Sequence, residues 1–186
     1  MTTGAVCSPH GVVSPSAWVE RWCKLIPAGG RVLDVAAGSG RHARFLATLG
    51  CRVEAVDRDA QALAGLDGLA GVTTRCADLE GAPWPYGGER FDGIVVTNYL
   101  HRPLFPALLA ALADPGVLIY ETFALGNERF GKPSNPDFLL RPGELLELAR
   151  GALHVIAYED VIAAAPRPAA LQRICAARGA IAAVAQ

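Results

Sequence analysis

The chain has 186 residues, of which 52% are hydrophobic and 19% are charged, so it is long enough for one well-buried domain and too apolar for extensive disorder. Seventeen basic and eighteen acidic residues leave a formal net charge of −1, which disfavours a long nucleic-acid footprint. The cysteines form no C-x-x-C pair and the histidines have no partner at ligand spacing. We therefore expect neither a disulfide framework nor a metal site.

The first half of the chain alternates helical and β-rich patterns. Ser14-Pro15 is expected to begin a helix that ends before Pro27, and residues 1–28 are expected to form an N-terminal helical cap. The pattern then predicts, in chain order, strand 31–36, helix 41–49, strand 52–56, helix 59–66, strand 72–76 and strand 91–97.

The second half continues the alternation, with one interruption. It predicts helix 104–113, strand 117–123, helix 142–150, strand 153–159 and strand 171–177. The interruption is polar and rich in Pro and Gly, and it lies within an expected substrate-side insertion over 124–139. Ordinary connectors have about 2–6 residues, so a longer one is typical of a binding loop. Strands that alternate with helices predict one α/β domain over 1–186, with a doubly wound sheet.

Two features bear on location. No Lys or Arg precedes Arg21, so the basic region of a signal peptide is not seen. The most apolar stretch, 104–120, contains the breaker Asp114-Pro115-Gly116, which favours a helix followed by a strand over a membrane span. We expect a soluble, cytoplasmic protein that does not enter membranes.

The turn after the first predicted strand reads Asp34-Val35-Ala36-Ala37-Gly38-Ser39-Gly40. Ligands of doubly wound sheets bind beyond the carboxyl ends of the strands, and glycines let the backbone approach them closely. Asp57 closes the second strand, where a carboxylate is placed to accept ribose hydroxyls, and Asp78 follows the third, where it is placed to read an adenine amino group. A tight turn without a ligand is the alternative.

Two classes of cofactor share this geometry. Gly38-Ser39-Gly40-Arg41-His42-Ala43 satisfies the G-x-G-x-x-A form of the dinucleotide fingerprint, so an NAD(P)-binding oxidoreductase is one alternative. Two observations argue against this alternative. The acidic side chain of Asp34 is unfavourable beside an anionic pyrophosphate, and the sequence has no Tyr-x-x-x-Lys pair for hydride chemistry. The acids instead suit a cofactor with a ribose, an adenine and a cationic tail.

The segment 32–40 resembles motif I of the class I S-adenosylmethionine-dependent methyltransferases, although Ala36-Ala37 stands where a glycine often occurs. The resemblance runs from about residue 29 to 123 and is strongest to the small bacterial type 11/12 and tellurite-resistance groups. It implies a mostly parallel seven-stranded sheet with an antiparallel last strand and S-adenosyl-L-methionine as cofactor. The motifs do not name an acceptor, and the balanced charge favours a small-molecule acceptor over nucleic acid. The cofactor-binding residues that the resemblance implies are Asp34, Ala36, Gly38, Gly40, Arg41, Asp57, Arg58, Asp78, Leu79 and Asn98.

Methyl transfer from a sulfonium is an in-line displacement that depends on alignment and exclusion of water, and a base is needed only if the acceptor must lose a proton. Three catalytic candidates follow the fourth and fifth strands. His101 is one candidate for a general base, because histidine titrates near neutral pH; the alternative is a surface or capping role. Tyr99 is placed for a cation–π contact with the sulfonium or for packing, and Glu121 faces the substrate side or is structural.

The segment Asn98-Tyr99-Leu100-His101 lacks both prolines of the Asn/Asp-Pro-Pro-aromatic motif found in amino-group methyltransferases of nucleic acids, so that chemistry is not favoured. A cofactor-binding subunit that activates another methyltransferase, without catalysing transfer itself, remains an alternative. Neither the acceptor nor the oligomeric state follows from the sequence.

Overall fold

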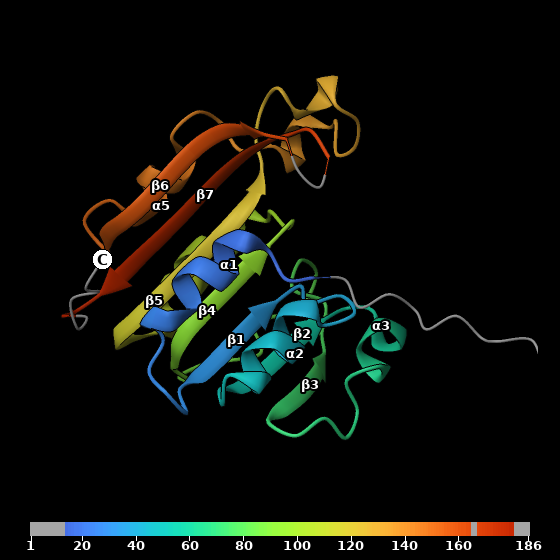
Figure 1. Ribbon diagram of the computed structural model, residues 1–186, viewed down its shortest axis with the longest axis vertical. Helices are drawn as coiled ribbons and strands as arrows, with labels where there is room; N and C mark the ends of the chain where they lie inside the picture. Colours follow the sequence, from blue (N-terminus) through green and yellow to red (C-terminus); the bar gives the residue numbers. More distant parts are fainter. Residues whose placement is uncertain (1–13, 165–166, 181–186) are drawn as a thin grey trace, which may run out of the picture.

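A computed structural model describes residues 14–164 and 167–180 of the chain. The strands form one seven-stranded sheet in the order β3-β2-β1-β4-β5-β7-β6, shown in Figure 1. Neighbouring strands from β3 to β5 are parallel, whereas β7 is antiparallel to both β5 and β6. The predicted fold class is confirmed. The strands are β1 (Arg31–Val35), β2 (Arg52–Asp57), β3 (Val72–Cys76), β4 (Phe91–Thr97), β5 (Leu112–Phe123), β6 (His154–Ala163) and β7 (Ala169–Arg178).

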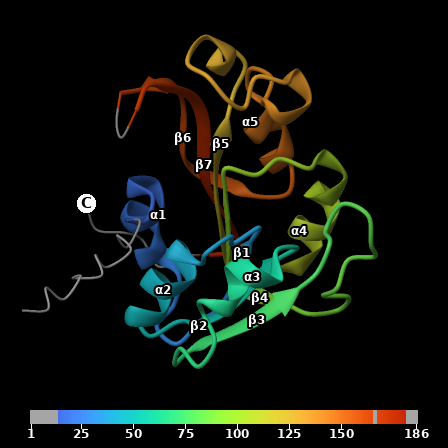
Figure 2. The same cartoon turned by 90° about the vertical axis from the view of Figure 1, so that its right-hand side faces the viewer.

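Helices cover both faces of the sheet, as Figure 2 shows. One face carries α1 (Ala17–Trp22) with the 3₁₀ turn η1 (Cys23–Leu25), α2 (Arg41–Thr48) and α3 (Ala60–Ala64). The other face carries α4 (Phe105–Ala111) and α5 (Glu144–Ala149). Three more 3₁₀ turns lie in the loops after β4 and β5: η2 (Arg102–Leu104), η3 (Asn127–Arg129) and η4 (Pro136–Phe138).

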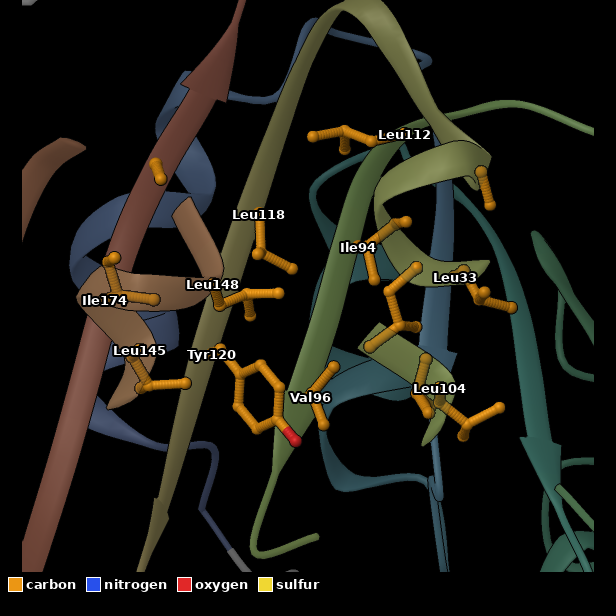
Figure 3. Close-up of a cluster of buried hydrophobic side chains, with 14 of the residues drawn as sticks. Leu33, Ile94, Val96, Leu104, Leu112, Leu118, Tyr120, Leu145, Leu148 and Ile174 are labelled. Carbon is orange, nitrogen blue, oxygen red and sulfur yellow. The ribbon is translucent and has the colours of Figure 1, made fainter. Parts of the chain in front are cut away.

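The core lies in two layers, one on each face of the central strands. Along β4, Val95 packs toward α1 and α2, whereas Ile94 and Val96 pack toward α4 and α5. Figure 3 shows the second layer, in which Val96 lies beside Tyr120 of β5, and Ile94 is level with Leu118. Burial on both faces explains why β4 reads as an unbroken apolar run.

A segment without a helix, between β3 and β4, completes this second layer. Tyr86 is buried there and packs edge-on against Trp84 and Phe91, with ring centroids 5.2 and 5.4 Å away. Its hydroxyl donates to Glu54 of β2 at 3.2 Å. Aromatic side chains thus cover the strands that a helix would otherwise cover.

Some predicted boundaries were wrong. The N-cap of α1 is Ser16, whose side chain accepts from the Trp18 amide, and Ser14 lies outside the helix. Strand β5 begins at Leu112, which pairs with Phe91, and the register then shifts so that Gly93 pairs with Val117. The breaker 114–116 therefore lies inside the strand as an irregularity. Strand β6 runs to Ala163 because it pairs with β7 along its whole length. Residues 1–13 of the expected cap lie outside the described residues.

The insertion over 124–139 is tied to the rest of the domain by two polar side chains. Arg102 donates to both carboxylate oxygens of Glu144, at 2.6 and 2.9 Å, and to the carbonyls of Asp137 and Leu139. Buried Asn127 donates to the Pro133 carbonyl and accepts from the Ala170 amide of β7. The segment is therefore held between the loop after β4 and strand β7.

The Arg102→Met variant tests this attachment, because it removes the hydrogen-bond donors of Arg102 and leaves the carboxylate of Glu144 buried. We expect the free energy of unfolding at pH 7 to fall by about 2 kcal/mol, measured by urea denaturation. Burial opposes ionisation of Glu144, but the hydrogen bonds from Arg102 and Arg141 outweigh it and lower the pKa from 4.5 to about 2. A carboxyl whose pKa is depressed in the folded state stabilises the fold fully above pH 4.5, and this contribution is lost as the pH falls toward 2. The difference in unfolding free energy between the wild-type protein and Arg102→Met should therefore shrink between pH 4.5 and pH 2.

The matched control is Arg150→Met, since Arg150 pairs with Glu147 at the surface. Surface pairs contribute up to about 1 kcal/mol, so we expect a smaller loss there. Equal losses in the two variants would show that the Arg102 pair does not anchor the insertion.

Candidate functional site

A pocket of about 190 Å³ opens at the carboxyl ends of β1 to β4. Its lining comes from the residues that end these strands or directly follow them: Ala36, Asp57, Arg58, Ala77, Asp78, Leu79, Glu80 and Tyr99. The chain runs from β1 outward to β2 and β3 and then returns to β4 on the other side of β1. The pocket thus lies at the switch point of strand order, which is the expected ligand position in this fold class.

The glycines of the turn after β1 have left-handed backbone conformations. Gly38 has φ 55° and Gly40 has φ 75°, and a Cβ at Gly40 would come within 2.4 Å of the Leu66 side chain. Ala36 also has a positive φ, 53°, which explains why a glycine often stands at this position. A left-handed alanine costs roughly 1 kcal/mol, so the chain accepts modest strain at the edge of the pocket.

Asp57 joins this turn to the end of β2. Its Oδ2 accepts from the Gly38 amide at 2.7 Å, and its Oδ1 accepts from the Asp59 amide at 2.9 Å. The side chain is half-buried and lines the pocket. Each carboxylate oxygen has a further lone pair, so Asp57 retains the capacity to accept hydroxyl groups from a ligand.

Asp78 and Arg58 lie in the same pocket. Asp78 accepts from the Glu80 amide at 2.9 Å. The amides of Glu80 and Gly81, with the charges of Arg58 and His101, hold the pKa of Asp78 below its usual range. Glu80, which was not predicted, also lines the pocket, and the acidic run after β3 was the signal that could have identified it.

Asp34 lies away from the pocket lining. It is buried, and its Oδ2 accepts from the Ala43 amide of α2 at 3.0 Å. Burial raises the pKa of Asp34 to about 7, against the opposing effects of the Ala43 amide and the Arg41 charge. Its predicted contact with a cofactor amino group stays a prediction.

The other predicted cofactor residues differ in their relation to the pocket. Leu79 lines it, whereas Gly38, Gly40, Arg41 and Asn98 stand next to it in the chain without lining it. Asn98 has the left-handed φ of 54°, and its amide donates to the Glu121 carbonyl at 3.0 Å. This bond joins the ends of β4 and β5.

The three catalytic candidates lie in different surroundings. Tyr99 lines the pocket, and burial together with Glu80 raises its pKa, so the phenol stays protonated at neutral pH. His101 precedes η2 and its carbonyl accepts from the Leu104 amide. Glu121 is 7% exposed, accepts from the Ser16 hydroxyl at 2.6 Å and pairs with Arg173 at 3.1 Å. Their catalytic roles stay predictions.

A family model described as a methyltransferase domain matches residues 32–114, the part of the chain that builds β1 to β4 and the pocket. Residues 32–114 are therefore similar to a methyltransferase domain. The chain is 36% identical, over 125 residues, to a protein-L-isoaspartate O-methyltransferase of Chlorobaculum tepidum. The aligned part makes up 61% of this chain and 52% of that protein. The chain therefore spans about half the length of this curated relative.

Solved structures of methyltransferases share the fold of this chain. TehB from Haemophilus influenzae superposes with a TM-score of 0.71 at 19% identity, over 87% of this chain and 61% of that one. An S-adenosylmethionine-dependent methyltransferase from Mesorhizobium loti superposes with a TM-score of 0.66 at 18% identity, over 87% and 98% of the chains. The resemblance predicted from 32–40 is thereby confirmed.

Within the described ranges, the helices are too short to cross a bilayer. The same part of the chain brings together no cluster of His, Cys, Asp and Glu of the size that holds a metal ion.

The buried carboxyl of Asp34 leads to a prediction about pH. Its folded-state pKa of about 7 exceeds the ordinary 3.8, so the folded protein binds this proton more tightly and loses stability as pH rises through that interval. Between pH 4 and pH 7.5, the free energy of unfolding of the unliganded protein should therefore fall by at least about 1 kcal/mol less in Asp34→Asn than in the wild-type protein, measured by urea unfolding.

Asp67→Asn is the control, because Asp67 is exposed. Its pH dependence should match the wild-type protein. An unchanged slope in Asp34→Asn would mean that Asp34 is ionised throughout the range.

Proposed function

We propose that this protein transfers a methyl group from S-adenosyl-L-methionine to a small-molecule acceptor. The observation that carries the proposal is the pocket at the ends of β1 to β4, where Asp57 ends β2 and Asp78 follows the neighbouring β3. In this arrangement Asp57 accepts the ribose hydroxyls, while Asp78 and the Leu79 backbone bind the adenine. The bound cofactor supplies an electrophilic methyl group on a sulfonium.

The charge of the pocket argues against a dinucleotide. Asp57, Asp78 and Glu80 line it with a single cation, Arg58. Like charges in one site repel, so these carboxylates disfavour the pyrophosphate of NAD(P). A cofactor with a neutral nucleoside and a cationic sulfonium meets no such repulsion.

The insertion over 124–139 is proposed to meet the acceptor. It follows β5, whose end is hydrogen-bonded to Asn98, and it presents Phe130 and Phe138 to solvent at 40% and 51% exposure. Arg129 lies 5.6 Å over the Phe130 ring. Exposed aromatic side chains on an anchored segment are suited to cover an acceptor and exclude water, which is what methyl transfer needs.

A small acceptor is favoured by the charge balance of the whole chain, which lacks the basic excess that nucleic acid requires. Among proteins that share the fold, the names of a coclaurine N-methyltransferase and a glycopeptide N-methyltransferase give acceptors of this kind. Both are under 20% identical to this chain, so they support the size class and not a particular compound.

Asp57→Ala tests the ribose assignment. The two charge-assisted hydrogen bonds that it removes are each worth about 1.5–3 kcal/mol, so binding of S-adenosylhomocysteine should weaken at least about tenfold, measured by calorimetry. The exposed Asp67→Ala should bind within about twofold of wild type. Tight binding of NAD by the wild-type protein, or unchanged affinity in Asp57→Ala, would refute the assignment.

The double variant Phe130→Ser, Phe138→Ser tests the acceptor side. With methyl-labelled S-adenosylmethionine and a small-metabolite extract, we expect label transfer to fall at least about tenfold, because apolar cover over the acceptor is lost. Affinity for S-adenosylhomocysteine should stay within about twofold. Leu49→Ser, at 51% exposure and the end of α2, is the control and should transfer normally. Transfer into RNA instead of metabolites, or undiminished transfer by the double variant, would contradict the proposal.

A further inference from the structure

A row of polar side chains crosses the sheet just below its carboxyl edge. Thr97 of β4 is level with Glu121 of β5, which is level with Arg173 of β7 and, beyond it, Glu159 of β6. Arg173 pairs with Glu121 at 3.1 Å and with Glu159 at 2.7 Å. Below the row, the residues on the α1 and α2 side of the same strands are apolar.

His42 of α2 joins this row to the start of α1. The side chain is 2% exposed, and its Nε2 accepts from the Ser16 amide at 3.1 Å. Its Nδ1 lies 3.3 Å from the Thr97 hydroxyl oxygen. Because Nε2 accepts a hydrogen bond from the Ser16 amide, the neutral ring carries its hydrogen on Nδ1, which donates a hydrogen bond to the Thr97 hydroxyl.

The Ser16 hydroxyl closes the connection by donating to Glu121 at 2.6 Å. Thr97, His42, Ser16, Glu121 and Arg173, here named the His42 network, thus form one continuous chain of hydrogen bonds. Polar groups in such a layer are costly unless every one is satisfied, so a satisfied chain specifies one arrangement of the elements that it joins.

The His42 network and the pocket share neighbouring residues in the sequence. Tyr99 lines the pocket, Thr97 belongs to the network, and Asn98 lies between them with its left-handed backbone. Asn98 is also bonded to the Glu121 carbonyl, and α2 begins directly after the glycine turn. The network therefore holds the backbone on the β4–β5 side of the pocket.

We propose that His42 is a positioning residue for the amino-acid half of the cofactor. The inference rests on the proposed function, in which the nucleoside half occupies the pocket. The rest of the cofactor then continues along the sheet edge past Asn98, over the backbone that His42 and Ser16 hold. His42 acts through Thr97 and Ser16 and does not itself touch the reacting atoms.

The ring performs this role in its neutral form. Burial lowers the pKa of His42 to about 3, and the charge of neighbouring Arg41 acts in the same direction. Glu121 and Arg173 are the charged groups that approach it from β5 and β7, through Ser16; Arg173 forms ion pairs with both Glu121 and Glu159. An imidazolium would lose the bond from the Ser16 amide, because both ring nitrogens would then be donors.

The test compares two ligands that differ in the amino-acid half. S-adenosylhomocysteine contains it, and 5′-methylthioadenosine lacks it. We expect His42→Leu to weaken S-adenosylhomocysteine at least about fivefold by calorimetry while 5′-methylthioadenosine stays within twofold. His154→Leu is the matched control, since His154 is exposed at the start of β6, and it should change neither affinity. His42→Gln, which keeps a donor and an acceptor, should recover part of the loss.

Equal weakening of both ligands, or of neither, overturns the role of His42 and leaves the proposed function standing. Failure of the wild-type protein to bind either ligand overturns both proposals. A measurement on the wild-type protein covers the case in which His42→Leu does not fold: nitrogen-15 NMR should show the His42 ring neutral, with its hydrogen on Nδ1, from pH 5 to 8. It should also show a larger ring shift on adding S-adenosylhomocysteine than on adding 5′-methylthioadenosine, and the reverse order overturns the inference.

Discussion

The hydrogen bond from the Gly38 amide to the Asp57 carboxylate is the contact on which the site depends. Strands β1 and β2 are parallel neighbours, so their carboxyl ends meet at the same edge of the sheet. The bond joins the turn after one to the last residue of the other, and crowding by Leu66 leaves room only for glycine at position 40, where α2 begins. The pocket, the acid that lines it and the direction of α2 all follow from this junction.

Charged and polar groups are buried on both faces of the sheet. Asp34 of β1, His42 of α2 and Glu121 of β5 lie on the face covered by α1 and α2, near the carboxyl edge, whereas Glu144 and Gln172 lie on the face covered by α5. Each of the first three has a hydrogen-bond partner from another element, which offsets the cost of burying it. These three groups thus lie near the edge where the ligand is proposed to bind.

The insertion combines a rigid attachment with an exposed apolar surface. Arg102 and Asn127 satisfy the backbone groups of a segment that is too rich in Pro and Gly to form a regular element. Its phenylalanines are not needed for the core and remain exposed. The side chains that hold the segment in place thus differ from those proposed to meet the acceptor.

The sequence by itself determined the order of helices and strands, the glycine turn and the positions of Asp57 and Asp78, because periodicity and turn chemistry are local and parallel strands bring their ends to one edge. Only the tertiary structure decided that Asp34 lies under α2 and outside the pocket lining, and that Glu121 is paired with Ser16 and Arg173, which are 105 and 52 positions away in the chain. The extents of β5 and β6 were likewise set by pairing with their neighbours. The physical reason is that a local pattern records which face of an element is apolar, whereas the partners of a buried polar group depend on register and packing between distant segments.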